Sequence, residues 1–432
     1  MNARRSLRSV VTLTLGRLTL VTLVAAALHA APAAANGVTT DLSTAARTIL
    51  GAGQGVYIES TDGTVLLAQA AEIPVHPASV SKVPTTLALL RKLGPEHRFL
   101  TTFSSSGRIV DGTLYGDLSV ATDGDPSLVD EDALLVAERL KESGLNRISG
   151  ELQARTPLTF NWHSDTAVSL LHRALTGQTP PAAWIAVREL EIANGVAPGS
   201  EALAQPGIAF SDPVTSPTTK ATEPSAVQLR GDQPLALYRS QPLLPLVKSL
   251  NDFSNNIIKP FADAAGGPAA VEALARGAVP VEMRSEITLG DGAGTDPSNR
   301  LSPRAAVKLL RALEAELAKS SHALYDILPV AGVDTGTLHD RLNSADEAGR
   351  VVGKTGTFGD YGASALIGAI STTDRGTVYF AILNHGVPVP QARKRQDQFV
   401  GTLLAHLNTV PWSYIRDARP AVARAEIVIP PR

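Results

Sequence analysis

The chain has 432 residues, of which 39 are basic and 41 acidic, and a formal net charge of -2 at pH 7. Because neither sign of charge dominates and aromatic residues make up only 4% of the chain, no nucleic acid is expected as a partner. The absence of cysteine excludes disulfides, thiolate catalysis and cysteine metal sites. The nine histidines are scattered without the paired spacing of zinc ligands, so we expect no metal and no cofactor.

The first 35 residues have the layout of a secretory signal peptide. Arg4, Arg5 and Arg8 form a basic segment, an apolar run covers 18–28, and three alanines at 33–35 follow it. We therefore predict a cleaved signal over 1–35, a periplasmic or cell-envelope location, and no stable membrane span after cleavage. An uncleaved anchor is the alternative interpretation.

A hairpin and a helix are predicted next. Residues 55–60 (GVYIES) and 64–69 (TVLLAQ) flank Thr61-Asp62-Gly63, which favours a β-hairpin. An apolar, helix-like segment follows over 76–90, and Gly94-Pro95 ends it. Pro84 lies within this segment, and a proline inside a helix removes a hydrogen bond, so we expect a bend there.

From 99 to 235 the chain consists of short β-like runs and then a Pro- and Thr-rich passage over 211–225. We interpret 99–235 as an inserted β-rich domain that separates two parts of a main domain, 36–98 and 236–410. The final segment, 411–432, has no convincing amphipathic membrane face. We expect this segment to be a loosely docked tail.

Helical patterns return from Pro242, and Ser302 can cap a helix that begins at Pro303. Three β-rich runs, GRVVGKTGT, GASALIGAIS and GTVYFAILN, follow before a final helix at about 392–407. The simplest assembly joins the early hairpin and these three runs in one mostly antiparallel sheet with helices on its faces. The expected fold class is therefore α+β.

Ser79 precedes Lys82 by three positions at the start of the first helix-like segment. On a helix this spacing puts both side chains on one face, so a neutral lysine amine could take the serine proton. Burial and nearby positive charge would have to lower the pKa of Lys82 for this role. The alternative is an N-capping serine followed by a solvated lysine.

A second candidate element is Lys354-Thr355-Gly356-Thr357, next to a predicted strand. A lysine and a hydroxyl at a strand edge suit a carboxylate, and a glycine lets a substrate backbone come close. An exposed turn with a solvated lysine is the alternative.

A third element is a Ser-x-Asn match, for which the sequence offers two candidates. Ser249 and Asn251 lie in an apolar helical pattern and are expected to face solvent, whereas Ser254 and Asn256 follow a plausible helix break. We choose the second pair. Ser254 could pass a proton between Lys82 and the leaving amine, and the Asn256 amide could hold a substrate peptide group.

The three motifs in this order resemble those of the D-alanyl-D-alanine carboxypeptidase/endopeptidase family of low-molecular-mass penicillin-binding proteins. Further similar passages are LYGDLSVATDGDPSL, LNDFSNNI, LGDGAGTDPSNRLSP and LPVAGVDTGTL. The resemblance implies a serine β-lactamase/DD-peptidase-like transpeptidase domain with a large insertion between the first and second motifs.

The resemblance also implies a role for each site residue. Ser79 would be the acylated nucleophile, Lys82 its base, Ser254 the proton shuttle and Asn256 a substrate-positioning amide. Lys354 and Thr355 would recognise the terminal carboxylate of D-alanine, and the N–H groups of Ser79 and Thr357 would form the oxyanion hole. Peptidoglycan stem peptides would be the substrates, and β-lactam antibiotics would be inhibitors.

Two alternatives remain open at this point. The same fold could be a β-lactamase or esterase, which requires fast deacylation. A non-catalytic peptidoglycan-binding protein is the other alternative, although the intact motif residues argue against it. The oligomeric state cannot be inferred from the sequence.

Overall fold

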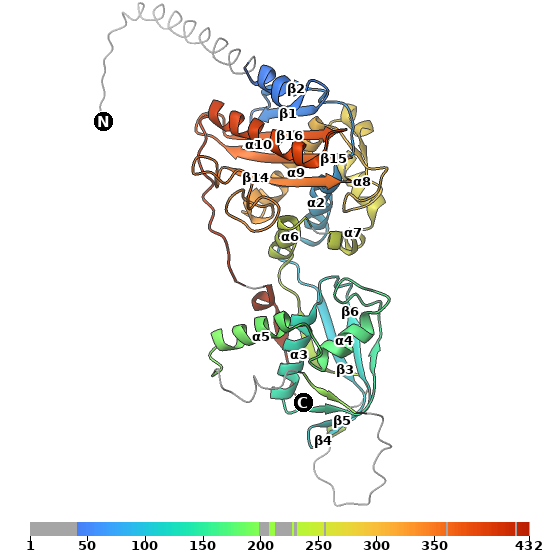
Figure 1. Ribbon diagram of the computed structural model, residues 1–432. Helices are drawn as coiled ribbons and strands as arrows, with labels where there is room; N and C mark the ends of the chain where they lie inside the picture. Colours follow the sequence, from blue (N-terminus) through green and yellow to red (C-terminus); the bar gives the residue numbers. More distant parts are fainter. Residues whose placement is uncertain are drawn as a thin grey trace, which may run out of the picture.

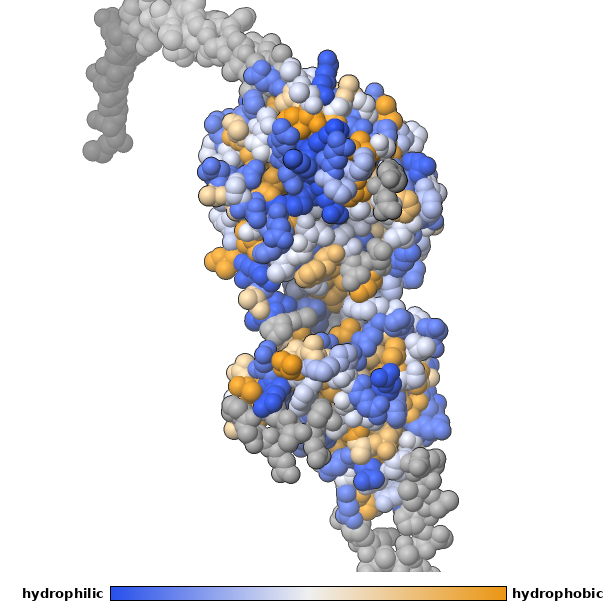
Figure 2. All heavy atoms as spheres, viewed as in Figure 1, coloured by the Kyte–Doolittle hydropathy of each residue, from blue (hydrophilic) through white to orange (hydrophobic). Residues whose placement is uncertain are grey.

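The computed structural model describes residues 41–197, 207–211, 227–228, 231–254, 256–359, 362–419 and 421–431. The predicted signal, 1–35, and residues 212–225 of the Pro- and Thr-rich passage lie outside the described residues. Figure 1 shows two domains that lie beside each other. The main domain contains the first part of the described chain and the later part that ends with α10, and the segment between these two parts forms most of the second domain. Figure 2 shows that the molecule narrows between them.

The main domain is built on a five-stranded sheet in the order β14-β15-β16-β1-β2, with all neighbouring strands antiparallel. The strand bounds are β1 Gly55–Ser60, β2 Val65–Gln69, β14 Val351–Phe358, β15 Ala363–Ser371 and β16 Thr377–His385. The early hairpin and the three late β runs therefore form one antiparallel sheet, as predicted. Apolar side chains are buried on both of its faces, which explains the nearly continuous apolar runs of β15 and β16.

Helices cover both faces of this sheet. One face packs against α2 and α9, and the other against η1 and α10. Ser302 Oγ accepts the N–H of Ala305 at 3.1 Å, so α9 begins at Pro303 as predicted. The remaining bounds in this domain are η1 Ala46–Leu50, η2 Ala78–Ser81, α2 Lys82–Leu93, α6 Leu243–Asp252, η4 Asn256–Ile258, α7 Lys259–Ala264, α8 Pro268–Gly277, η5 Val281–Glu286, β12 Ile287–Thr288, β13 Arg300–Leu301, α9 Pro303–Ala318, η6 Leu324–Asp326 and α10 Val389–His406.

The second domain combines short strands with helices and has its own apolar core. Its sheets have the strand orders β17-β11-β3-β6-β8 and β10-β4-β5-β7-β9. Three helices, α3 to α5, belong to the same domain, so its β-rich description is incomplete. The bounds are β3 Leu100–Ser105, β4 Arg108–Val110, β5 Thr113–Tyr115, β6 Leu118–Thr122, α3 Asp130–Glu142, β7 Arg147–Ile148, β8 Leu152–Ala154, α4 Ala167–Leu175, α5 Pro181–Ala193, β9 Ala209–Phe210, β10 Val227–Gln228, β11 Gln233–Arg239, η7 Ala421–Arg424 and β17 Glu426–Val428.

The prediction of a loosely docked tail is wrong. Residues 411–419 and 421–431, here called the C-terminal strap, contact both domains. Trp412 Nε1 donates to the carbonyl of Arg350 at 3.1 Å in the main domain, and β17 pairs with β11 in the second. This end of the sequence contains only a short β-like run, Glu426–Val428. Such a short run forms a strand only when a partner strand, here β11, lies beside it. Within the described residues, no helix is both long and apolar enough to cross a membrane.

Candidate active site

Ser79 and Lys82 lie where the short helix η2 continues into α2. Lys82 Nζ donates to Ser79 Oγ at 2.8 Å and to the carbonyl oxygen of Ala293 at 2.6 Å. The Lys82 side chain is fully buried and Ser79 is 8% exposed. Ala78, directly before the serine, has φ 49°. This left-handed conformation is costly for alanine and is typical of backbone held at a functional site.

Pro84 does not interrupt a helix interior, so the reason for expecting a bend there does not apply. Residues 78–81 form a 3-10 turn and α2 begins at Lys82, so Pro84 falls in the first helical turn. N–H groups in a first turn have no acceptor within the helix, and a proline is tolerated there. The prediction was wrong because it assumed that the helix already included the serine.

Burial is the main cause of the altered basicity of Lys82. It lowers the pKa of the amine from 10.5 to about 8. Of the nearby charges, Asp291 raises the pKa and Lys259 lowers it. Lys259 Nζ lies 3.5 Å from Asp291 Oδ2. With a pKa of about 8, roughly a tenth of Lys82 is neutral at pH 7 and the neutral fraction grows as the pH rises, so the amine can act as a general base.

The loop that holds the Ala293 carbonyl is fixed by Asp291. Its carboxylate accepts the N–H of Gly294 at 2.8 Å and the hydroxyl of Thr295 at 2.5 Å. Burial opposes ionisation of Asp291, but hydrogen bonds led by Thr295 outweigh it and hold the pKa below its usual range. Gly294 has φ 85°, and a Cβ there would lie 1.9 Å from the carbonyl of Ala78. Only glycine lets this loop approach η2 so closely.

The edge strand β14 brings the second motif against the serine. A Cβ added to Gly356 would lie 2.6 Å from the carbonyl of Pro77 and 3.1 Å from the nitrogen of Ser79. Lys354 is fully buried, and its Nζ donates to the carbonyl of Thr355 at 2.9 Å. Burial, and then the charge of Lys82, lower the pKa of Lys354 well below its usual value. The first and second motifs therefore share one buried site.

Two side chains beside β14 were missed by the sequence analysis. Thr355 Oγ1 donates to Thr337 Oγ1 at 2.8 Å, and Arg393 Nη2 in α10 donates to Thr357 Oγ1 at 2.8 Å. Thr337 lies in the family-like passage LPVAGVDTGTL but was given no role there, and Arg393 belongs to none of the quoted passages. Only the tertiary fold brings them to the strand.

The third motif lies at the end of α6. Ser254 has φ 52° and its N–H donates to the carbonyl of Asn251 at 3.3 Å. Asn256 begins η4, but its side chain lies outside what the structure describes. The N–H of Thr337 donates to the carbonyl of Asp252 at 2.8 Å. This bond joins the helix end before Ser254 to the loop that contacts Thr355.

Of the rejected Ser-x-Asn pair, Ser249 is exposed as expected, but the expectation that Asn251 faces solvent was wrong. Asn251 is fully buried. Its Nδ2 donates to the carbonyl of Ile327 at 3.0 Å and to Thr86 Oγ1 at 3.3 Å. The amide holds α6 against its neighbours, whereas Ser249 Oγ donates to the carbonyl of Leu246 within the helix.

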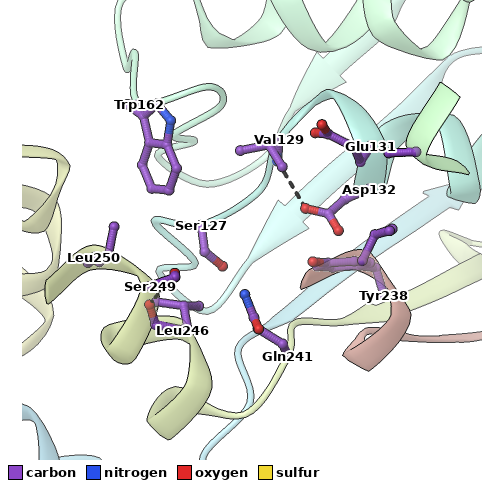
Figure 3. A pocket seen from close by; sticks show the side chains of 12 residues that line it. Ser127, Val129, Glu131, Asp132, Trp162, Tyr238, Gln241, Leu246, Ser249 and Leu250 are labelled. Atoms are coloured by element: carbon purple, nitrogen blue, oxygen red, sulfur yellow. Dashed lines mark hydrogen bonds between the residues drawn. The ribbon is translucent and has the colours of Figure 1, made fainter. Parts of the chain in front are cut away.

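A separate cavity of about 300 Å³ lies between α6 and the second domain. Figure 3 shows Trp162, Tyr238, Gln241 and Asp132 around it. Burial raises the pKa of Asp132 to about 8, but its carboxylate accepts the N–H of Val129 at 3.1 Å and so caps α3. None of the predicted site residues lines this cavity, and its buried acid has a structural explanation.

A buried lysine in contact with a serine, set against the edge of an antiparallel sheet, defines a serine hydrolase that works through an acyl-enzyme. The sequence profile of the D-Ala-D-Ala carboxypeptidase 3 (S13) family matches residues 40–168 and 173–406, and the chain belongs to this family. The predicted recognition and enzyme class are confirmed: the protein is a serine-type D-Ala-D-Ala carboxypeptidase.

Curated relatives agree with the family match. The chain is 27% identical over 394 residues to carboxypeptidase DacB of Mycolicibacterium smegmatis, and this alignment covers 82% of this chain and 80% of that protein. It is 26% identical over 433 residues to D-alanyl-D-alanine carboxypeptidase of an Actinomadura species, which covers 79% of each.

Solved structures confirm the predicted fold. A penicillin G-acylated predatory endopeptidase from Bdellovibrio bacteriovorus superposes with a TM-score of 0.69 at 21% identity and covers 87% of this chain and 99% of that chain. Penicillin binding protein 4 from Haemophilus influenzae superposes with a TM-score of 0.57 at 19% identity and covers 85% and 99%, respectively.

Proposed function

We propose that the protein releases the terminal D-alanine of peptidoglycan stem peptides through an acyl-enzyme on Ser79. The observation that carries this proposal is the 2.8 Å contact between Lys82 Nζ and Ser79 Oγ in a site where the pKa of the lysine is about 8. A neutral Lys82 removes the hydroxyl proton as Ser79 Oγ attacks the carbonyl carbon of the penultimate D-alanine.

The backbone N–H groups of Ser79 and Thr357 stabilise the oxyanion of the tetrahedral intermediate. Ser254 relays the proton from Lys82 to the leaving nitrogen, and the amide of Asn256 positions the substrate peptide. D-Alanine then departs and water hydrolyses the ester on Ser79. Thr355 and Thr357 contribute hydroxyls to the carboxylate of the leaving D-alanine, and Gly356 lets the substrate backbone approach β14.

Two finer assignments belong to this proposal. The enzyme also cleaves cross-linked stem peptides, because the peptide nitrogen of a cross-link can take the place of the terminal D-alanine nitrogen. The mature protein works in the periplasm or at the equivalent face of the cell envelope, where its substrate is located. The family match and the signal-like layout of 1–35 support this location.

The test is intact-mass analysis of the mature protein and of Ser79→Ala after incubation with benzylpenicillin. We expect an adduct with the mass of the whole drug on the first protein and none on the second. If no adduct forms and the drug remains intact, the result supports a non-catalytic binding protein. If no lasting adduct forms but the drug is consumed, the result supports a β-lactamase.

Substrate preference needs a second measurement. The protein is incubated with a stem pentapeptide and with a purified cross-linked dimer, and the products are separated by liquid chromatography. Release of D-alanine from the pentapeptide defines the carboxypeptidase activity, and conversion of dimer to monomer defines the endopeptidase activity. Ser79→Ala is the control for both, since both reactions pass through the same acyl-enzyme.

A further inference from the structure

The side chains of the Lys354–Thr357 segment leave β14 on opposite faces. Successive residues of a strand alternate between the two faces of a sheet. The side chain of Lys354 is buried near Lys82, which lowers its pKa. Thr357 contacts α10, which covers the other face of the sheet. The side chains of Thr355 and Thr357 therefore lie on one face of β14, and the side chain of Lys354 lies on the other face.

The leaving group of a D-Ala-D-Ala peptidase carries a carboxylate on the carbon attached to the scissile nitrogen. Burial, and then the charge of Lys82, lower the pKa of Lys354, and its ammonium donates to the carbonyl of Thr355, so Lys354 is a less available counter-ion for that charge than an exposed cation. A cation that remains charged at every working pH would serve better, and arginine is the side chain with this property.

Arg393 is such a cation and lies beside Thr357. It projects from the N-terminal part of α10, is exposed to solvent, and donates through Nη2 to Thr357 Oγ1 at 2.8 Å. Hydrophilic side chains gather over α10 on the face shown in Figure 2. A guanidinium has five N–H donors, and this bond uses one of them. The other donors can accommodate a carboxylate that also accepts the hydroxyls of Thr355 and Thr357.

The groups around Arg393 keep its charge available. Asp397, the carboxylate that raises the pKa of Arg393, accepts Arg341 Nη2 at 2.7 Å and Arg341 Nε at 3.0 Å. Burial, and then the charge of Arg341, lower the pKa of Arg393 from a very high value, and an arginine stays protonated in proteins. The two arginines together make the local potential positive, which attracts an anionic substrate.

We propose that Arg393 is a specificity-determining residue that binds, together with Thr355 and Thr357, the carboxylate next to the scissile bond. The inference rests on the proposed function of Ser79 as the acylated nucleophile. It adds a substrate contact from a helix that carries none of the sequence motifs.

The experiment compares two substrates that differ only in charge: an acyl-D-alanyl thioglycolate ester with a free carboxylate, and the same thioester as its carboxamide. Wild type, Arg393→Gln and Arg393→Lys are assayed on both. Lys394→Gln is the matched control, because Lys394 is the next residue of α10, is exposed and loses the same charge.

For Arg393→Gln, we expect kcat/KM on the carboxylate substrate to fall about tenfold to hundredfold, mainly through KM, as the loss of a charged hydrogen bond predicts. Activity on the carboxamide should be unchanged, which also shows that the variant is folded. Arg393→Lys should recover part of the loss, and Lys394→Gln should resemble wild type.

Equal losses on both substrates would show that Arg393 only supports β14, and an unchanged Arg393→Gln would show that it has no role; either result overturns the inference. If wild type cleaves neither thioester and forms no adduct with benzylpenicillin, the proposed function itself fails. That outcome is distinguishable because it is seen before any variant is made.

Discussion

Lys82 and Lys354 are both fully buried, and the charge of Lys82 contributes to the lowered pKa of Lys354. Two ammonium groups in one buried site repel each other and lose hydration, so the site favours a state with fewer than two protons on the pair. Burial, which lowers the pKa of Lys82 to about 8, makes this lysine suitable as a base. It also makes the site sensitive to pH.

The rate of acylation should follow the deprotonation of the lysine pair, because only neutral Lys82 can accept the Ser79 proton. Since the pKa of Lys82 is about 8, kcat/KM should rise about tenfold per pH unit below that value and level off above it. Stopped-flow measurement of benzylpenicillin acylation between about pH 5.5 and about pH 9.5 checks this. A flat profile would rule Lys82 out as the base.

Asp291 and Lys259 should move that profile in opposite directions. Asp291 raises the pKa of Lys82 and Lys259 lowers it. Asp291→Asn should therefore shift the midpoint to lower pH, and Lys259→Gln should shift it to higher pH. The Lys259 effect should be the smaller one and should shrink in high salt, because this side chain is about half exposed (53%). Shifts in the same direction would contradict the electrostatic explanation.

Replacing Lys82 with methionine should abolish acylation yet stabilise the protein. The pKa of Lys82 falls from 10.5 to about 8 on folding, so the folded state is penalised wherever the unfolded lysine is protonated. The free energy of unfolding of the variant should exceed that of wild type by at most about 3 kcal/mol at pH 7. This difference should have its largest value below pH 8 and should decrease as the pH rises toward 10.5. Thermal unfolding at several pH values measures it, and a less stable variant at pH 7 would contradict this account.

Gly356→Ala should reduce activity without unfolding the protein. The added Cβ would lie 2.6 Å from the carbonyl of Pro77, so β14 and η2 must separate and the nitrogen of Ser79 must move. Overpacking typically costs about 1 to 3 kcal/mol, and we expect kcat/KM to fall roughly tenfold to hundredfold. Gly53→Ala is the control, because a Cβ at Gly53 meets no heavy atom within 4 Å.

The C-terminal strap should stabilise the main domain through Tyr414. Its hydroxyl donates to Asp334 Oδ1 at 2.7 Å, and Asp334 is 1% exposed. Tyr414→Phe leaves a buried carboxylate oxygen without this donor and should lower the free energy of unfolding by about 1 to 3 kcal/mol. Tyr325→Phe is the matched control, because this ring packs against Tyr414 at 5.5 Å and its hydroxyl makes no hydrogen bond with another described residue. Equal losses in chemical denaturation would contradict the role of the Tyr414 hydroxyl.

Local patterns were sufficient for much of the fold. Two β-like runs flanking the turn residues 61–63 predicted the first hairpin, and Ser302 before Pro303 predicted the start of α9. The membership of the hairpin and the three late runs in one antiparallel sheet was predicted, but the pairing of β1 with β16 was not. The domain boundaries and the roles of the site residues remain predictions.

Tertiary contacts explain what the sequence analysis missed. Asn251 was assigned to solvent because it is polar, but its amide finds the carbonyl of Ile327, 76 positions away. Thr337 and Arg393 reach β14 only when the loop before it and α10 after it have packed. The strap could not be predicted from β17 alone, since a three-residue strand has no preference without its partner.

The order of strands in the main sheet has a consequence for the time course of folding. β1 lies between β16 and β2, and Gln54 beside it hydrogen-bonds to His385, 331 positions later in the chain. Contacts that join such distant segments form late, because a very long loop must close before they can be made. In the second domain, strands β3 to β11 have nearer partners and can pair earlier, although β17 joins them only at the end of the chain. We therefore expect Ser79 to lie against a complete sheet only after almost the whole polypeptide is available, so that chains interrupted before β16 remain inactive.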